Sequence, residues 1–151
     1  KFIDENVSSS RLRGAVKTLR ENGIDFSEER DHEDSLFSME DGRRAVGRLL
    51  DRAPDITAIF ALSDSLAIGA MRGVSDRGLR IPEDISIIGY DGIDYCRYSV
   101  PRLATVRQDT KLLARRCVDE LLLMISYKHP AIHEVIPYEL IDDESISRPC
   151  K

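Results

Sequence analysis

The sequence contains no tryptophan, and aromatic residues make up 6% of it, so few large rings are available for a core. It has three cysteines at wide spacing: Cys96, Cys117 and Cys150. An odd number at such spacing suits neither a disulfide framework nor a zinc knuckle, which favours reduced thiols. His129 and His133 lie four positions apart, but Pro130 opposes the helix that would align them as metal ligands. These absences predict a protein with no metal site and no cofactor.

Long apolar runs and an excess of positive charge are also missing. No run approaches the roughly 18 apolar residues of a membrane span, and no signal peptide opens the chain, so we expect a cytoplasmic protein without membrane contact. The formal net charge is −5, whereas nucleic-acid affinity rests largely on lysine and arginine neutralising phosphates. The balance of 42% hydrophobic and 32% charged residues is typical of a globular domain. We therefore expect a globular chain that does not itself grip DNA.

Motifs for catalysis are absent as well. The sequence has no Gly-x-Ser-x-Gly elbow, no phosphate-cradling Gly-x-x-x-x-Gly-Lys and no dinucleotide-binding Gly-x-Gly-x-x-Gly after a strand. The acid pair Asp142 and Asp143 lies in a polar tail, where a solvated surface is the ordinary role. Since no nucleophile has a partner base, the chain is not expected to be an enzyme.

Hydrophobic spacing predicts four helices. The first covers residues 9–22 and is followed by the stop signal Gly23, and the second covers 42–51. A third begins after a cap formed by Ser63 and Asp64 and ends at Gly78. The fourth is a long amphipathic helix over 111–127.

Between the helices, short apolar segments predict strands. Residues 57–62 form a continuous apolar run, typical of a strand that is covered on both faces in a parallel sheet. Residues 85–88 form a second buried strand, and 103–107 a short third one. Phe2 and Ile3 begin a further strand, and 132–141 alternate as an edge strand broken by Pro137. The order of elements predicts an α/β fold with a mainly parallel sheet flanked by helices.

Polar residues follow the predicted strands where ligands bind in open α/β sheets, at the carboxyl ends. Ser63 and Asp64 follow the first buried strand, Asp91 the second and Gln108 the third, while Arg11 follows the opening strand. A hydroxyl, carboxylates, an amide and a guanidinium around one cavity suit a polyhydroxylated or heterocyclic ligand.

Each of these residues also has an ordinary structural interpretation. Ser63 or Asp64 can serve as a helix N-cap, and Asp91 is a natural turn residue. Phe37, in the acidic loop before the second helix, can tuck into the core. The arginine and the glutamine can be a solvated surface charge and a strand-end amide.

Four segments together carry a family resemblance. The stretch from Ala58 to Ala70 looks like a family strand-to-helix motif, and the stretch from Gly78 to Asp91, with Ile81-Pro82-Glu83-Asp84-Ile85-Ser86-Ile87-Ile88-Gly89-Tyr90-Asp91, is the most diagnostic. Residues 101–109 and 10–14 match as well. On these residues the chain resembles the effector-binding part of the lactose-repressor family over almost its whole length.

The resemblance implies a sensor of the periplasmic-binding-protein-like type, with an effector between two lobes and a helix-turn-helix headpiece ahead of them. It places residues 1–107 in the C-terminal lobe and 131–151 in a returning tail. Residues 108–130 match the helix that crosses to the N-terminal lobe, so its apolar face is expected to be exposed or covered by a partner. The headpiece and most of the N-terminal lobe are expected to lie outside this chain, and DNA would be bound only through that headpiece.

The resemblance also assigns roles at the site. Arg11 matches an arginine that grips the effector, Phe37 a ring that stacks on it, and Asp91 an acceptor from its hydroxyls. Ser63 and Gln108 match polar positions that line the cleft. The predicted effector site is Arg11, Phe37, Ser63, Asp64, Asp91 and Gln108.

The family further implies a homodimer, a sugar or purine-like effector, and control of transcription by closure of the cleft. Leu66, Met71 and Val74 can then belong either to the core or to a dimer interface. A sugar-binding component of a transporter shares the fold and is the main alternative, and a sugar-processing enzyme is a third.

Overall fold

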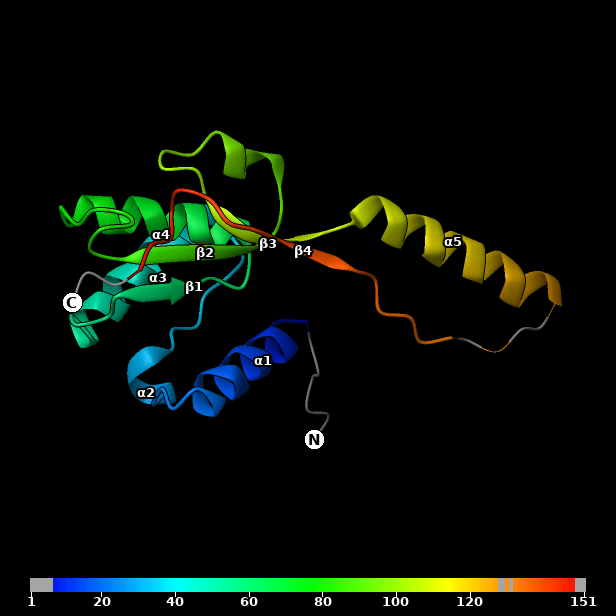
Figure 1. The fold of residues 1–151 in the computed structure, drawn as a ribbon, viewed down its shortest axis with the longest axis horizontal. Coiled ribbons are helices and arrows are strands. Elements are labelled where there is room, and N and C mark those ends of the chain that lie inside the picture. The colour runs from blue at the N-terminus through cyan, green and yellow to red at the C-terminus, as the bar shows by residue number, and fades with distance from the viewer. Residues whose placement is uncertain (1–6, 128–129, 131, 149–151) are drawn as a thin grey trace.

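The computed structural model describes residues 7–127, 130 and 132–148, so the strand predicted at Phe2 and Ile3 lies outside the described residues. The helices are α1 (Val7–Glu21), α2 (Glu28–Asp31), α3 (Met39–Arg52), α4 (Asp64–Asp76) and α5 (Thr110–Tyr127), with a 3-10 turn at Asp94–Arg97. The strands are β1 (Ala58–Phe60), β2 (Ser86–Asp91), β3 (Ala104–Gln108) and β4 (Tyr138–Ile141). They form one sheet in the order β1-β2-β3-β4 (Figure 1).

The sheet is mainly parallel, as predicted. β1 pairs with β2, and β2 with β3, in parallel, whereas β4 runs antiparallel to β3. The edge strand predicted at 132–141 is shorter than expected: β4 begins only after Pro137, because proline has no N–H to donate to a neighbouring strand. Residues 132–136 are irregular. The predicted α/β class with a mainly parallel sheet is confirmed.

Side-chain caps fix where the longer helices begin. Ser63 Oγ accepts a hydrogen bond from the backbone N–H of Leu66 at 3.3 Å, so α4 begins at the next residue. Asp109 Oδ1 accepts from the backbone N–H of Leu112 at 2.9 Å and opens α5 in the same way. Gly78, with φ of +72°, follows α4 in the left-handed conformation that glycine adopts readily.

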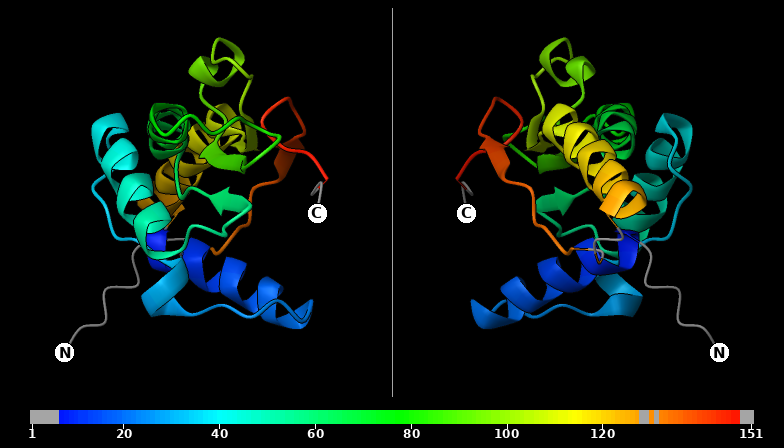
Figure 2. Two further views of the ribbon diagram at one scale, coloured as in Figure 1. Left: turned by 90° about the vertical axis from the view of Figure 1, so that its left-hand side faces the viewer. Right: turned by 90° about the vertical axis from the view of Figure 1, so that its right-hand side faces the viewer.

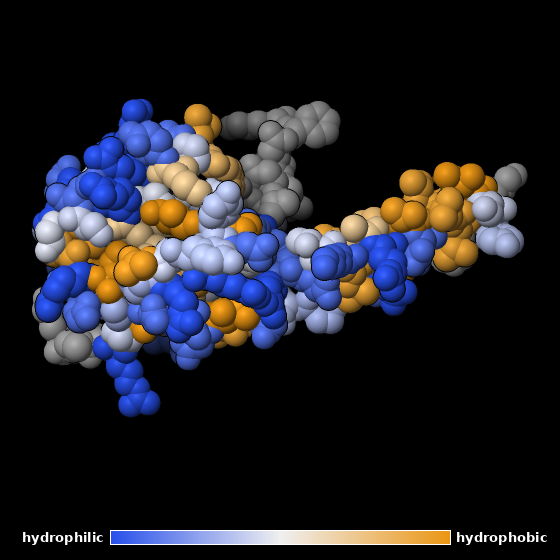
Figure 3. Space-filling view, turned by 90° about the horizontal axis from the view of Figure 1, so that it is seen from above, coloured by the Kyte–Doolittle hydropathy of each residue, from blue (hydrophilic) through white to orange (hydrophobic). Residues whose placement is uncertain are grey.

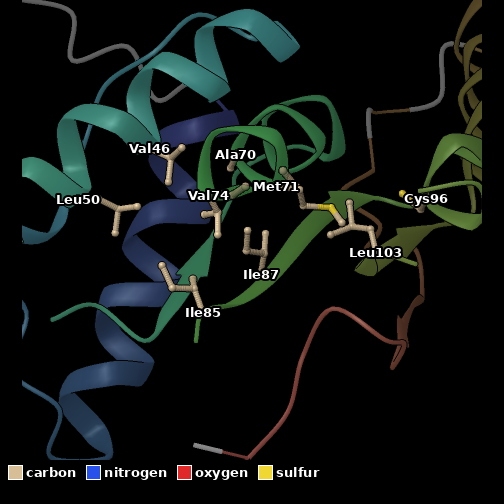
Figure 4. Close-up of a cluster of buried hydrophobic side chains, with 11 residues drawn as sticks. Val46, Leu50, Ala70, Met71, Val74, Ile85, Ile87, Cys96 and Leu103 are labelled. Atoms are coloured by element: carbon tan, nitrogen blue, oxygen red, sulfur yellow. The ribbon is translucent and has the colours of Figure 1, made fainter. Parts of the chain in front are cut away.

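The core lies between the sheet and α3 and α4, which pack against each other on one face (Figure 4). Its largest fully buried apolar side chains are Ile85, Ile87, Leu103 and Val74. The two helices approach closely at Gly69, where a Cβ atom would lie 1.9 Å from the carbonyl oxygen of Met39. Met71 and Val74 therefore belong to the core, which resolves their assignment, and Leu66 packs against it in part.

The prediction that the strand at 57–62 is covered on both faces is wrong. Ile59 packs against the core, but Ala58 and Phe60 point to the other face and are exposed. On that side α1 and α2 stand apart from the sheet (Figures 1 and 2), and a cavity of about 800 Å³ separates Leu12, Val16 and Leu19 of α1 from the strands. An apolar run indicates that its residues favour burial, whereas their actual burial depends on where the neighbouring helices pack.

Ser145, which follows β4, ties the tail to the sheet. Its Oγ accepts from the backbone N–H of Ala104 at 2.8 Å and donates to the carbonyl of Ile87 at 2.6 Å. Ser145 is fully buried, and its own carbonyl accepts from the N–H of Ile87. The tail thus completes the hydrogen bonding of β2 and β3 at the end opposite the polar cluster described below.

Helix α5 projects away from the sheet, and none of its residues is buried (Figure 1). Apolar side chains gather along it in the space-filling view (Figure 3). Those that are more than half exposed are Val118, Leu121, Leu122, Ile125 and Tyr127. The expected exposed apolar surface is therefore present. No helix among the described residues is long and apolar enough to cross a membrane.

Candidate functional site

Arg11 joins α1 to the carboxyl end of the sheet. Its Nη1 donates to the carbonyl oxygen of Leu62 at 2.6 Å, just after β1, and its Nη2 donates to Asp91 Oδ1 at 3.0 Å. The Arg11 side chain is 13% exposed and that of Asp91 is 32% exposed, so solvent screens this ion pair only in part. The guanidinium is thus held in place from both sides.

Asp91 lies at the centre of a polar cluster formed with Arg11 and Gln108. Gln108 Nε2, at the end of β3, donates to the same Oδ1 atom at 2.9 Å. Within residues 7–127, 130 and 132–148, no donor reaches the second oxygen, Oδ2, which can accept a hydrogen bond from a ligand. Burial raises the pKa of Asp91, and Arg11 and Gln108 offset only part of that rise. A ligand that donates to Asp91 would replace some of the lost solvation.

The backbone of Asp91 is strained. Its φ of +119° is rare for a residue with a side chain, and such conformations cost about 1–3 kcal/mol. The surrounding structure has to hold it, and strain of this kind is concentrated at functional sites.

Two aromatic rings stand beside the polar cluster. The Arg11 guanidinium lies 3.9 Å from the centroid of the Tyr90 ring, which Phe60 meets edge to face at 6.4 Å between centroids. Both rings, with Arg11 and Gln108, line a cavity of about 760 Å³ between α1 and the sheet. A cavity that combines an aromatic wall with forked donors suits a ring-shaped polar ligand.

Asp64 lies beneath this cluster and has no exposed surface. Its Oδ2 accepts from the backbone N–H groups of Gly92 and Ile93 at 2.6 and 2.8 Å, and its Oδ1 accepts from Thr105 Oγ1 at 2.6 Å. Both carboxylate oxygens are therefore engaged within the protein.

The other two predicted site residues lie differently. Ser63 is 5% exposed and caps α4, which is the ordinary interpretation of that position. Phe37 is 55% exposed and lines the larger cavity between α1, α3 and the sheet, not the one beside Arg11 and Gln108. The structure thus brings Arg11, Asp91 and Gln108 together but not Phe37.

Sequence reasoning missed Tyr90 and Phe60. A signal was present, because each stands close to the end of its strand, on the face opposite the core-facing Ile59 and Gly89. Because side chains alternate between the two faces of a strand, both rings could have been predicted to lie on the face of the sheet that α1 faces.

The described residues contain no group of three or more histidine, cysteine or acidic side chains that could hold a metal ion. Burial, with Asp64 nearby, raises the pKa of the Cys96 thiol to about 12, so this cysteine stays protonated at neutral pH. Cys117 is exposed on α5.

Residues 3–146 match the family described as periplasmic binding protein-like domain. The chain belongs to this family. It is 39% identical over 146 residues to the HTH-type transcriptional regulator MalR of Clostridium butyricum, covering 94% of this chain and 42% of that protein. The chain thus spans less than half the length of the curated relatives it matches.

Solved structures agree with this placement. A complex of the transcriptional regulator CelR with cellobiose superposes with a TM-score of 0.85 at 32% identity, over 89% of this chain and 41% of that one. A LacI-family regulator from Enterococcus faecium with bound ribose gives 0.82 at 33% identity, over 95% and 53%. The resemblance to the lactose-repressor family is confirmed, and these relatives are transcriptional regulators, not transporter components.

Proposed function

We propose that this chain is the effector-sensing part of a transcription regulator, and that its effector binds at Arg11, Asp91 and Gln108. The observation that carries the proposal is the convergence of Arg11 and Gln108 on one carboxylate oxygen of Asp91, beside the Tyr90 ring. These side chains supply no nucleophile with a base, so the site binds a ligand and does not transform it.

A sugar or a nucleobase fits this site best. Asp91 accepts from a ligand hydroxyl or ring N–H, Arg11 donates to neighbouring oxygens, and Gln108 can do either. Tyr90 and Phe60 line the cavity and offer apolar surface to a pyranose or a heterocycle. The cellobiose and ribose complexes of similar regulators support this class of effector.

Residues 1–107 would form the C-terminal lobe of the sensor, and 108–130 would cross to an N-terminal lobe. The exposed apolar residues of α5 support this assignment, because a soluble protein normally covers such a surface. Ligand between the lobes would favour one relative orientation of them, which a headpiece on DNA would sense. The regulator would act in the cytoplasm as a homodimer, and a dimeric Lac repressor is among the similar solved structures.

Calorimetric titration of the full-length gene product tests the proposal. The panel contains ribose, lactose, cellobiose and nucleobases, and the variants are Arg11→Ala and Asp91→Asn. Asp51→Asn serves as the matched control, since it removes a carboxylate that pairs with Arg77 on the exposed surface.

We expect at least one compound whose binding falls more than tenfold in both site variants and stays unchanged in the control. A compound that binds the wild type and both variants equally would place the site elsewhere. If no panel compound binds the wild type, the effector belongs to another chemical class.

A further inference from the structure

The buried carboxylate of Asp64 connects three elements beneath the candidate site. It stands at the first position of α4, its Oδ2 accepts from the N–H groups of the two residues that follow β2, and its Oδ1 accepts from Thr105 on β3. Asp64 has no exposed surface, and these partners are what a fully buried carboxylate requires. These hydrogen bonds to a charged acceptor are the stronger kind.

The position of Asp91 depends on the turn that begins directly after it. Asp91 has φ of +119°, which is unfavourable for a residue with a side chain, and Gly92 follows with φ of +78°, which glycine adopts readily. A Cβ atom on Gly92 would lie 2.4 Å from a side-chain carbon of Arg107, which shows how closely this turn lies against β3. Without a fixed partner for the amides of Gly92 and Ile93, the turn would relax, and the Asp91 carboxylate would move away from Arg11 and Gln108.

We propose that Asp64 is a positioning residue: by accepting from the amides of Gly92 and Ile93, it holds the strained turn that presents Asp91 to the effector. It does not touch the effector, because both of its oxygens are engaged and no part of it reaches the cavity surface. Its packing against Gly89, where a Cβ atom would lie 2.3 Å from Asp64 Oδ1, leaves no room for it to swing outward. The effector-binding part of this inference rests on the proposed function, whereas the holding of the turn does not.

Hydrogen exchange of the full-length gene product tests the holding of the turn without any ligand. The amides of Gly92 and Ile93, followed at residue resolution by mass spectrometry, should be strongly protected in the wild type. In Asp64→Asn, an isosteric change, the amide oxygen is a weaker acceptor than the carboxylate, so both should exchange about tenfold faster.

Thr105→Val is the matched variant, because it removes the donor to Oδ1 and leaves the two bonds to Oδ2 in place. It should leave the exchange of Gly92 and Ile93 within a factor of two of the wild type. Rapid exchange of both amides in the wild type overturns the proposal, and so does equal acceleration by the two variants. The wild-type measurement decides the matter even if Asp64→Asn fails to fold.

A double-mutant cycle tests the action through Asp91. With ribose, lactose and cellobiose as probes, Asp64→Asn should weaken binding at least fivefold in the wild type and less than twofold further in Asp91→Asn. Independent, multiplying losses would mean that Asp64 affects binding by a route other than Asp91, against the proposal. If none of the three sugars binds the wild type, the proposed effector class fails, while the exchange measurements still decide the role of Asp64.

Discussion

Because α3 and α4 pack closely, a glycine-to-alanine substitution on these helices should raise or lower the free energy of unfolding according to its position. At Gly69 an added Cβ atom would lie 1.9 Å from the carbonyl oxygen of Met39, whereas ordinary contacts begin near 3.4 Å. The obstacle is backbone, so the helices would have to separate by the difference, about 1.5 Å. Overpacking of this kind costs up to about 3 kcal/mol, and replacing a helix-interior glycine by alanine returns about 1 kcal/mol. Gly69→Ala should therefore lower the free energy of unfolding by about 2 kcal/mol.

Gly47→Ala is the matched substitution on the same pair of helices. Its Cβ atom would meet only the guanidinium of Arg77, at 3.6 Å, which is an ordinary contact. The gain in helix propensity then stands alone, and we expect stabilisation by about 0.5–1 kcal/mol. Urea unfolding followed by circular dichroism measures both variants. A change of the same sign in the two would refute the reasoning from helix separation.

Three further predictions concern the site and its support. A double-mutant cycle of Arg11→Ala and Asp91→Asn should give a coupling free energy of about 1–2 kcal/mol in urea unfolding, between the values for exposed and buried pairs, and zero coupling would contradict the geometry. Because burial raises the pKa of Asp91, the folded state holds its proton more tightly, and this contribution to stability is lost as pH rises through the raised pKa. Asp91→Asn should then gain stability relative to the wild type as pH increases above about 4, and a gain on acidification would be the wrong sign. Ser145→Ala should cost roughly 2–4 kcal/mol in the same assay, since it leaves the N–H of Ala104 and the carbonyl of Ile87 without this partner, and a loss below 1 kcal/mol would show that both groups find another.

Local signals were sufficient for much of the fold. Ser63 as a cap and Gly78 as a stop position α4 through contacts within a few residues, and such contacts can be predicted from spacing. The short α2 was not predicted, because its four residues leave too little pattern. The cover of β1 was misjudged, because it depends on the distance between α1 and the sheet.

The candidate site divides in the same way. Asp91 and Gln108 were expected together because the ends of neighbouring parallel strands converge at one edge of a sheet, and their hydrogen bond follows from that topology. Arg11 was expected there too, but it reaches Asp91 from α1, and the strand predicted ahead of it lies outside the described residues. Asp64 and its neighbour Ser63 both follow β1, yet one lies buried under the turn and the other caps a helix. The donor to Ser63 is three residues away, as an N-cap pattern predicts, whereas the donors to Asp64 are 28 to 41 positions away, and sequence spacing carries no information on those contacts.

The short junction between β3 and α5 means that a small rotation at the end of the strand moves the far end of the helix by a much larger distance. Gln108 is the last residue of the strand, only Asp109 separates it from the helix, and α5 then runs for 18 residues. At 1.5 Å per residue the lever arm is about 27 Å long, so a rotation of 10° at Asp109 displaces its far end by about 5 Å. A shift at Gln108 too small to alter the sheet would thus be magnified into a movement as large as one helical turn.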